Sequence, residues 1–408
     1  MKKIVVTGMG AVTPVGIGVE NYWNNITAGA SGIDTIKTFD PSELAVQIAG
    51  EVKDVNPSDY LPKDLIRKTD PFMQYAYIAA EEAMKQSGIK IEPERTGIVM
   101  GTAMAGIATI AYTQEALTGA SHKKVGPRFI PKILGNIAAA NIAIDYNIQG
   151  PSFTVSTACS SGGDAINTAC MCMQSGKADI MLAVGAESVL CPLVIYSLAN
   201  AKALSRRNDS PSTASRPFDV TRDGFVIGEG GGALVLETEE HALARGAKIY
   251  AEIRGCGNTD DAYHVTAPHP EGRGAIACMK QAIAEAGINP SDIGYINAHG
   301  TATNKGDTVE TSSIKKVFGN TLPYVSSTKG ATGHMMGAGG ITETITCVKA
   351  IETGTVPPTI NLNEVDPECA GIDFVANTAK KAEINFAMSN AFGFGGQNSS
   401  IIVGKYGK

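Results

Sequence analysis

The amino-acid sequence predicts an α/β protein built from two similar halves. A helix-like pattern that closes at Gly88 leads through a β-like run to Gly101, and the same series recurs from Gly287 to Gly300 with the same spacing. Further pairs of segments repeat in the same order, namely 155–163 with 325–340 and 230–236 with 395–403. The period is too long for a solenoid. We therefore interpret it as a duplicated α/β unit, with an N-terminal half over residues 1–250 and a C-terminal half over 251–408.

The expected elements follow from local signals along the chain. The run Ile4–Val6 is strand-like, and Asp70-Pro71 supplies an N-cap followed by proline at the first position of a helix. This helix is expected to end at Gly88, because glycine readily adopts the left-handed conformation that follows a helix C-terminus. The run Ile180–Val184 is apolar throughout, which is typical of a strand covered on both faces. Three more expected helices close on glycines, at Gly176, Gly287 and Gly354.

The composition excludes several classes of protein. Glycine is abundant, at 46 of 408 residues, whereas charged residues make up only 18% and apolar residues 43%. Such a chain is neither disordered nor a charged coiled coil. Its formal net charge of −6 lacks the basic excess that nucleic-acid-binding proteins often show. No segment has the features of a signal peptide or a membrane-spanning helix, and the eight cysteines lie scattered, so we expect a reduced, cytoplasmic protein.

Motifs for nucleotides and metals are missing from the sequence. It contains no phosphate-binding loop of the G-x-x-x-x-G-K-[ST] type, no H-E-x-x-H, and no G-x-G-x-x-G that opens a helix after the first strand. The histidines and cysteines nowhere cluster at the spacing of metal ligands. We therefore expect no metal, no bound cofactor and no nucleic-acid or membrane partner.

One segment has a pattern that is typical of a catalytic nucleophile. The strand-like run Phe153–Val155 leads into the small residues Ser156–Gly163, and a helix-like pattern follows. This places Cys159 at a turn between a strand and a helix, where the positive end of the helix dipole favours a thiolate. Cysteine is also among the most buried residue types, so the alternative is inert packing, which we expect for the other seven.

Two of the six histidines have surroundings like those of Cys159. His299 follows the strand-like Tyr295-Ile296, and His334 lies in a loop of small residues after the short strand Tyr324-Val325. A single histidine in such a place is more often structural than catalytic. One cysteine and two histidines at strand ends are better explained as one site at the carboxyl ends of the strands.

Four motifs in order carry a resemblance to a known family. They are Thr157–Gly162, Asn297–Thr301, Ser327–Lys329 with Gly333-His334, and Asn390–Gly396. In this order they resemble the signature set of the β-ketoacyl-[acyl-carrier-protein] synthases, most closely the synthase II type. The likeness runs from Val6–Gly10 to the last strand and includes Ser215–Asp219 and Arg222–Phe225. It implies a thiolase-like fold, in which two similar βαβαβ-type halves form a layered α-β-α-β-α arrangement.

The resemblance also implies a decarboxylative Claisen condensation in fatty acid elongation. The Cys159 thiolate would take an acyl chain from acyl carrier protein, and the enolate left when malonyl-carrier protein loses CO₂ would attack that thioester. His299 and His334 are expected to donate hydrogen bonds to the malonyl thioester carbonyl, which stabilises the enolate. Lys329 is expected to orient the site through an ion pair with Glu343, although a simple buried salt bridge is the alternative.

Further positions match family roles around the reacting atoms. The backbone N–H groups of Cys159 and Phe394 match an oxyanion hole, and Phe394 with Gly395 matches a gate on a glycine-rich loop. Thr301 and Thr303 match positions that hydrogen-bond the pantetheine arm, with ordinary loop caps as the alternative. The residues expected in the acyl pocket are Met104, Phe129, which would reach across a dimer, and Phe392.

The implied partner is acyl carrier protein, which carries the substrates on its phosphopantetheine. That protein is acidic and this chain is net negative, so docking requires a local basic patch. The family is typically homodimeric, and we expect a homodimer here. The residues that occupy or adjoin the family's docking positions are Lys63, Arg67, Lys68, Lys123, Lys124 and Lys202.

Departures from the family pattern leave other functions open. Ala331 stands where methionine is frequent, and Ala391 and Gln397 replace a serine and a threonine of the Phe394 loop. A paralogous ketosynthase of a type II polyketide or polyene pathway is therefore the main alternative. A chain-length partner subunit typically lacks the nucleophile, and a Cys-His hydrolase needs one histidine with an orienting Asn or Asp. A degradative thiolase would place a second cysteine near the C-terminus, and the 392–397 loop has none.

Overall fold

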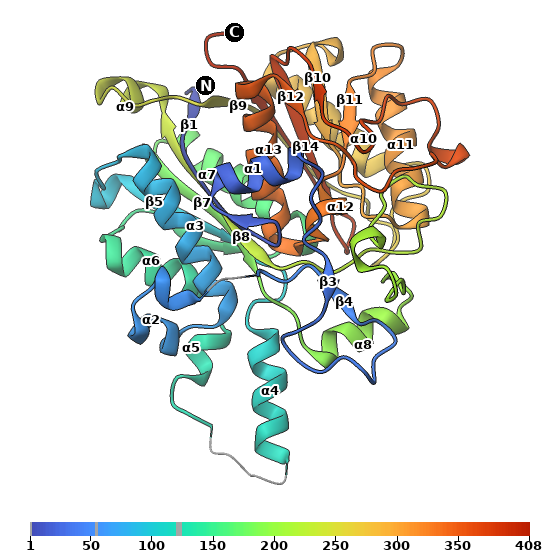
Figure 1. The fold of residues 1–408 in the computed structure, drawn as a ribbon. Coiled ribbons are helices and arrows are strands. Elements are labelled where there is room, and N and C mark those ends of the chain that lie inside the picture. Colours follow the sequence, from blue (N-terminus) through green and yellow to red (C-terminus); the bar gives the residue numbers. More distant parts are fainter. Residues whose placement is uncertain (1, 54–55, 120–124) are drawn as a thin grey trace.

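One large mixed β-sheet organises the chain, in a computed structural model that describes residues 2–53, 56–119 and 125–408 (Figure 1). The strands of the sheet follow the order β11-β10-β14-β15-β9-β1-β8-β7-β5-β6, with β2 paired to β1. From the N-terminal half come β1 (Ile4–Thr13), β5 (Thr96–Gly101), β6 (Ser152–Val155), β7 (Ile180–Glu187) and β8 (Gly230–Thr238). From the C-terminal half come β9 (Ala251–Asp260), β10 (Ile293–Asn297), β11 (Tyr324–Ser326), β14 (Phe386–Phe392) and β15 (Gln397–Gly404).

The two halves of the sheet have the same strand order and the same strand directions. From the centre outward, β1-β8-β7-β5-β6 matches β9-β15-β14-β10-β11. In each half the first two pairings are antiparallel and the last two are parallel. The halves meet where Ile4–Val6 of β1 pairs antiparallel with residues 251–253 of β9. The predicted α/β fold with two similar halves is therefore confirmed.

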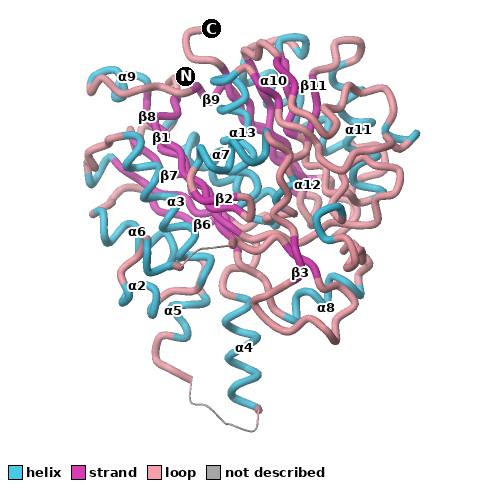
Figure 2. The backbone as a smooth tube through the Cα atoms, viewed as in Figure 1, coloured by secondary structure: helices cyan, strands magenta, loops and turns pink. Residues whose placement is uncertain are grey.

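Helices form three layers that alternate with the two halves of the sheet (Figures 1 and 2). The outer layers are α3 (Pro71–Ser87) with α6 (Asn136–Tyr146) on one half, and α10 (Arg273–Ala286) with α11 (Asn304–Phe318) on the other. The central layer is α7 (Ser161–Gln174) and α13 (Gly339–Thr353), which contact each other and strands of both halves. Each helix thus buries an apolar face against the sheet, as a layered α-β-α-β-α arrangement requires.

The predicted helix boundaries follow from their capping residues. The Asp70 side chain accepts a hydrogen bond from the Phe72 N–H at 3.1 Å and caps the start of α3. Gly88, Gly287 and Gly354, which follow α3, α10 and α13, are left-handed with φ of 61°, 65° and 59°. Gly176, just beyond the end of α7, has a φ of 75°. The sequence signals for these four helix ends are confirmed.

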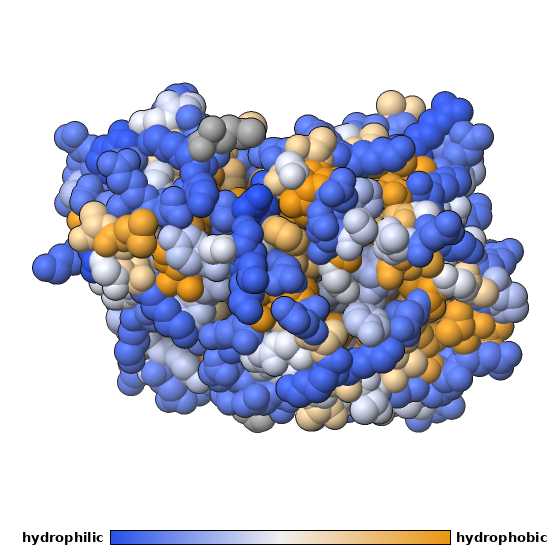
Figure 3. Space-filling view, turned by 90° about the horizontal axis from the view of Figure 1, so that it is seen from above, coloured by the Kyte–Doolittle hydropathy of each residue, from blue (hydrophilic) through white to orange (hydrophobic). Residues whose placement is uncertain are grey.

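The remaining elements are mostly short and lie outside the layers just described. Helices α4 and α5 extend away from the sheet at the bottom of Figure 1, whereas the face that carries both termini is mostly hydrophilic with small apolar patches (Figure 3). No helix in the described ranges combines the length and the hydrophobicity needed to cross a bilayer. These elements are β2 (Gly16–Ile17), α1 (Val19–Thr27), β3 (Asp34–Thr35), β4 (Ile48–Ala49), α2 (Lys63–Lys68), α4 (Ile107–Thr118), α5 (Phe129–Ile133), α8 (Pro192–Asn200), α9 (Glu239–Ala244), α12 (Lys329–Thr332), β12 (Thr355–Val356) and β13 (Lys380–Lys381).

Candidate active site

Cys159, His299 and His334 meet in one buried site. Cys159 lies in the single turn between β6 and α7, His299 follows β10, and His334 follows α12 beyond the end of β11. Their thiol and imidazole nitrogen atoms all lie within 4.8 Å of one another. His334 Nε2 is 2.9 Å from Cys159 Sγ, and the two imidazole rings are 5.3 Å apart and nearly perpendicular. The structure thus places together the three residues singled out from the sequence.

Glycines allow the two halves to bring these residues so close. A Cβ atom on Gly340 at the start of α13 would lie 2.4 Å from the backbone nitrogen of Gly163 at the start of α7. A Cβ atom on Gly162 would lie 2.8 Å from the carbonyl oxygen of Gly337. The two helix starts therefore pack backbone against backbone, which only glycine permits. These glycines belong to the matched segments 155–163 and 325–340. The two copies of the repeat therefore contact each other, and this contact brings Cys159 close to His334.

The Cys159 thiol is buried and protonated at neutral pH. Its exposed fraction is 8%, and loss of hydration raises its pKa to about 11. The backbone N–H groups of Phe394 and of Cys159 itself point at the sulfur and oppose this rise, as does the nearby Lys329 charge. Burial thus opposes the thiolate that a helix N-terminus favours. A base must take the proton when the sulfur attacks, and His334 Nε2 is in reach.

Both histidines are held neutral. Burial lowers the pKa of His299 and of His334 well below its usual value, and the Lys329 charge lowers both further. Within the described residues, neither Nδ1 atom has a hydrogen-bond partner. The Phe225 ring packs edge-on against His334 at 5.4 Å, and the Phe392 ring lies 6.0 Å from that of His299. These aromatic neighbours keep the imidazoles in an apolar setting, where a neutral ring is the stable form.

Lys329 supplies a buried positive charge at this site. Its side chain is 2% exposed and forms an ion pair with Glu343, whose side chain is 5% exposed. Burial raises the pKa of Glu343 and the lysine opposes that rise. Because the Lys329 charge also acts on Cys159 and both histidines, it biases the whole site toward anionic sulfur and neutral imidazole.

The Phe394 loop closes the site from the hairpin between β14 and β15. Phe394 is 39% exposed, and its neighbours Gly395 and Gly396 have φ of +92° and +84°, a backbone conformation that favours glycine. The Gly395 N–H donates to the carbonyl of Val265 at 2.7 Å. The loop therefore presents the Phe394 N–H inward to Cys159 while the side chain stays partly in solvent.

The remaining predicted site residues fall into two groups. Met104 packs against the apolar cluster that contains Cys159 and Phe225, and Thr301 and Thr303 lie after His299 with their hydroxyl oxygens 3.1 Å apart. Phe392 lies against His299. Phe129 is elsewhere, because it begins α5 and lines a separate hollow of about 790 Å³ that is formed by residues of α2, α4 and α5.

The predicted docking residues are dispersed. Lys63, Arg67 and Lys68 are exposed on α2, where Asp64 pairs with Arg67 at 2.8 Å and also with Lys68. Lys202 is exposed just after α8, and α2 and α8 lie on either side of α4 (Figure 1). Lys123 and Lys124 lie outside the described residues.

Sequence reasoning missed two cations near Arg67. Arg128 and Lys132 line the same 790 Å³ hollow as Arg67 and Phe129. Arg67 comes from α2, whereas Arg128 precedes α5 and Lys132 lies near its end, so the charges are far apart in the sequence. Their only sequence signal is a basic residue on either side of the segment Phe129–Pro131, a pattern that is too common to single out.

Sequence reasoning also missed two buried carboxylates that hold the loops of the site. Glu187 at the end of β7 accepts hydrogen bonds from the N–H groups of Ala103, Met104 and Gly337 at 2.6–3.1 Å. Glu310 on α11 accepts the N–H groups of His299 and Gly300, both at 2.8 Å. Burial raises the pKa of each to about 7. Glu187 had one available signal, since it ends an otherwise apolar strand.

Comparisons with known proteins agree along the whole chain. Residues 1–242 match the family model "Beta-ketoacyl synthase, N-terminal domain" and residues 250–363 match "Beta-ketoacyl synthase, C-terminal domain". The chain is 44% identical over 409 residues to 3-oxoacyl-[acyl-carrier-protein] synthase 2 of Coxiella burnetii, covering 99% of each chain. Among solved structures, it resembles the ishigamide ketosynthase/chain length factor with a TM-score of 0.92 and 34% identity, covering 100% of each chain. It also resembles a ketosynthase bound to the hexaketide in complex with its type II acyl-carrier protein, with a TM-score of 0.89, 33% identity and 99% coverage of each chain.

Proposed function

The chain belongs to the β-ketoacyl synthase family, and from this premise we propose how its residues perform the reaction of a 3-oxoacyl-[acyl-carrier-protein] synthase. The enzyme is an acyltransferase that condenses an acyl chain with a malonyl unit in fatty acid elongation. The observation that carries the proposed roles is the contact of His334 Nε2 with Cys159 Sγ at 2.9 Å, together with two backbone N–H groups aimed at the same sulfur.

In the first half-reaction Cys159 becomes acylated. Sγ attacks the carbonyl carbon of the acyl thioester as its proton passes to His334 Nε2, which lies at hydrogen-bonding distance. The carbonyl oxygen becomes an oxyanion, and the N–H groups of Cys159 and Phe394 are placed to bind it. When the tetrahedral intermediate collapses, the pantetheine sulfur leaves and takes the proton from His334. The acyl chain stays on Cys159 as a thioester.

In the second half-reaction the malonyl unit loses CO₂ and attacks. The bond between its carboxylate carbon and its α-carbon breaks, and the electron pair forms an enolate on the thioester. Neutral His299 donates an N–H hydrogen bond to the enolate oxygen, and His334 does the same after exchange with water has moved its ring proton from Nδ1 to Nε2; both bonds stabilise the enolate. The α-carbon then attacks the acyl carbonyl, and Cys159 leaves as a thiolate beside the charge of Lys329. Uptake of one proton from solvent then restores the Cys159 thiol. The product is a 3-oxoacyl chain on the carrier protein.

The substrates arrive on the phosphopantetheine arm of acyl carrier protein, so this reaction needs no separate organic cofactor. Thr301 and Thr303, whose hydroxyl oxygens lie 3.1 Å apart in the segment after His299, are placed to hydrogen-bond that arm. Met104, against the same apolar cluster as Cys159, limits the acyl chain. Phe394 acts as the gate, since its loop combines an exposed ring with two glycines of positive φ.

The carrier protein docks beside α2 and α5. Arg67, Arg128 and Lys132 line one hollow. Three positive charges together attract an acidic partner more strongly than the isolated Lys202 does. Asp64 neutralises part of the charge of Arg67 and Lys68, so the cluster at the hollow carries the greater attraction. Lys63 adds a further exposed charge on α2.

The active enzyme is a homodimer of chains that each fold as two halves, joined near residue 250. In the described residues β6 pairs only with β5, so its other edge is open, and Phe153 on this strand is 47% exposed. Open edges with apolar side chains are unstable toward further pairing. If a second copy of the chain paired its own β6 with this one, it would cover the open strand edge and the exposed Phe153 ring. Gel filtration with light scattering of the wild type and of Phe153→Lys tests this, and a monomeric wild type contradicts it.

Fatty acid elongation is favoured over a polyketide pathway. The relative from Coxiella burnetii is 44% identical, whereas the polyketide ketosynthase bound to the hexaketide is 33% identical. The test is to incubate the purified protein with a ladder of saturated acyl-carrier proteins and malonyl-carrier protein, and to record the masses of the products. We expect each saturated acyl chain to gain a 3-oxo two-carbon unit once. Repeated extension without reduction would favour the polyketide alternative.

A further inference from the structure

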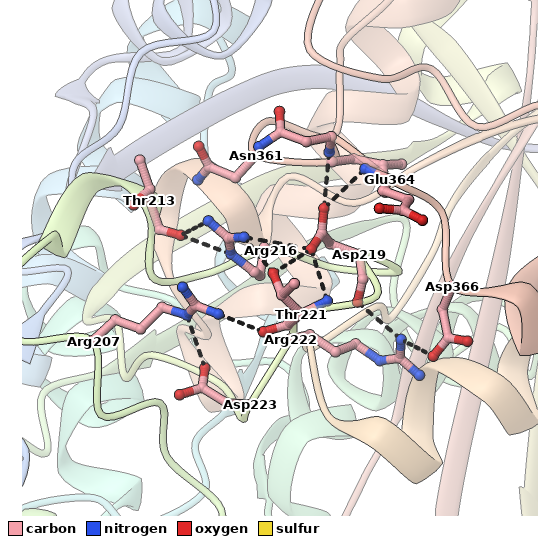
Figure 4. Close-up of polar contacts among 12 residues, drawn as sticks. Arg207, Thr213, Arg216, Asp219, Thr221, Arg222, Asp223, Asn361, Glu364 and Asp366 are labelled. Carbon is pink, nitrogen blue, oxygen red and sulfur yellow. Dashed lines mark hydrogen bonds and ion pairs between the residues drawn. The ribbon is translucent and has the colours of Figure 1, made fainter.

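One arginine in the network of Figure 4 uses all of its hydrogen-bond donors. Arg222 is 4% exposed, and its guanidinium has five N–H groups. Two of them contact the Asp219 carbonyl at 3.0 Å and the Asp366 carboxylate at 2.5 Å. The other three donate to the carbonyls of Thr303 and Asn304 at 3.3 and 2.9 Å and to the Thr308 hydroxyl at 3.1 Å.

Those last three contacts all fall on the segment that follows His299. Thr303 and Asn304 end the His299 loop and begin α11, and Asp307 lies one turn further along. The Asp307 carboxylate accepts the Ala302 N–H at 3.1 Å and is 3.6 Å from Arg222 Nε. Arg222 therefore fixes the loop both directly, through its carbonyls, and indirectly, through Asp307.

The chain next to Arg222 also holds the other histidine. The Gly224 N–H donates to the carbonyl of Ala302, in the His299 loop, at 3.0 Å. Two residues further along the same segment, Val226 contacts His334. There the His334 N–H donates to the Val226 carbonyl at 2.7 Å, and the Phe225 ring packs on the His334 imidazole. Residues 222–226 are thus a short strap with the His299 loop bound at one end and His334 at the other.

From these contacts we infer that Arg222 is a positioning residue for the malonyl half-reaction, because it sets the His299 loop relative to His334 through the strap 222–226. This rests on the roles proposed above for the two histidines. Cys159 lies in the turn between β6 and α7, and the N–H groups that face its sulfur are its own and that of Phe394, none of which Arg222 contacts. His334, the proposed base for acylation, is held at the far end of the strap by Val226 and Phe225, whereas Arg222 itself bonds the His299 loop. Loosening Arg222 should therefore impair decarboxylation and condensation while acylation of Cys159 continues.

Lysine is a demanding substitute at this position. It keeps the positive charge beside Asp307 and Asp366, so the buried carboxylates stay compensated, but its single ammonium cannot reproduce a fork of five donors. Arg222→Lys should free the Thr303 and Asn304 carbonyls without leaving an unpaired buried charge. Arg216→Lys is the matched control, because Arg216 is 9% exposed in the same network and bonds Thr213, Asp219 and Thr221 (Figure 4).

The experiment measures the two half-reactions separately in the full-length wild type, Arg222→Lys and Arg216→Lys. Acylation is followed by the mass of the protein after mixing with acyl-carrier protein, and decarboxylation by CO₂ release from malonyl-carrier protein. We expect Arg222→Lys to acylate within about twofold of the wild type but to lose decarboxylation and condensation by roughly tenfold or more, since a displacement on the order of 1 Å costs about 100-fold. Arg216→Lys should keep both half-reactions within about threefold.

Two results would overturn the inference. One is that acylation and decarboxylation fall together in Arg222→Lys, and the other is that the two variants behave alike. If Arg222→Lys does not fold, Asp366→Asn decides, because it turns a charged acceptor of Arg222 into a neutral amide at the outer end of the network, where the aspartate side chain is 18% exposed. It should lower decarboxylation with acylation unchanged, and unchanged decarboxylation overturns the inference. A wild type that neither acylates nor decarboxylates would instead contradict the proposed function.

Discussion

Substituting Gly340 by alanine perturbs the contact that holds the two catalytic segments together. Gly340 starts α13, just beyond His334, and faces Gly163, near the start of the helix that follows Cys159. The substitution adds one methyl group and no charge. The φ of Gly340 is in the ordinary negative range, so the loss of activity comes from the space that the methyl group occupies and not from backbone strain.

The structure gives the size of this perturbation. The added Cβ would lie 2.4 Å from the Gly163 nitrogen, whereas ordinary contacts begin at 3.4 Å. The helix starts must therefore separate by about 1 Å, and such a misplacement costs roughly 100-fold in rate when it moves a catalytic group. Gly162→Ala offers a milder case, because its Cβ would lie 2.8 Å from the Gly337 carbonyl oxygen. We expect that variant to lose about tenfold.

The assay is the steady-state rate of condensation from acyl-carrier and malonyl-carrier protein, with circular dichroism to check that each variant is folded. Gly126→Ala is the control, since among the described residues nothing lies within 4 Å of the Cβ that it would add. The expected order of rates is wild type and Gly126→Ala first, then Gly162→Ala, then Gly340→Ala. A folded Gly340→Ala enzyme with a rate within about twofold of the wild type would refute the link between this glycine contact and catalysis.

Three further predictions concern the nucleophile, the pocket and the docking surface. Because burial raises the pKa of Cys159 to about 11 and only the thiolate reacts, its alkylation by iodoacetamide should climb through pH 10 without a plateau, and levelling off near pH 8 would contradict this. Met104→Gly should lengthen the acyl chains in the products, as read from their masses, and an unchanged chain-length profile would remove Met104 from the pocket. Reversing Arg67 and Lys68 to glutamate should raise KM for carrier-bound substrates with little change in kcat, whereas the exposed Arg273→Glu should leave KM unchanged.

The sequence was most informative where backbone conformation and chemistry leave few choices. Gly88 and Gly287 mark helix ends and have positive φ. The sequence repeat that contains them corresponds to the strand order that the two halves share. Cys159 and the two histidines stood out because reactive side chains rarely follow strands among small residues. The family resemblance then supplied roles for residues such as Phe394 that have no chemistry of their own.

Burial and long-range contacts were harder to predict. The helix dipole that acts on Cys159 can be anticipated from the local sequence, whereas the desolvation that raises its pKa depends on the whole fold. Glu187 and Glu310 hold the site loops through backbone N–H groups, and such contacts leave no motif in the residues that donate. The cations Arg128 and Lys132 join Arg67 only through the tertiary structure.

The most direct test of the mechanism is to locate the acyl group during the reaction. The protein is mixed with acyl-carrier protein, digested, and its peptides are weighed by mass spectrometry, with and without a later addition of malonyl-carrier protein. We predict that the acyl mass appears on the peptide that contains Cys159 and disappears from it as 3-oxoacyl-carrier protein forms. Acylation of a different residue, or full condensation by Cys159→Ala, would contradict the central role of this cysteine.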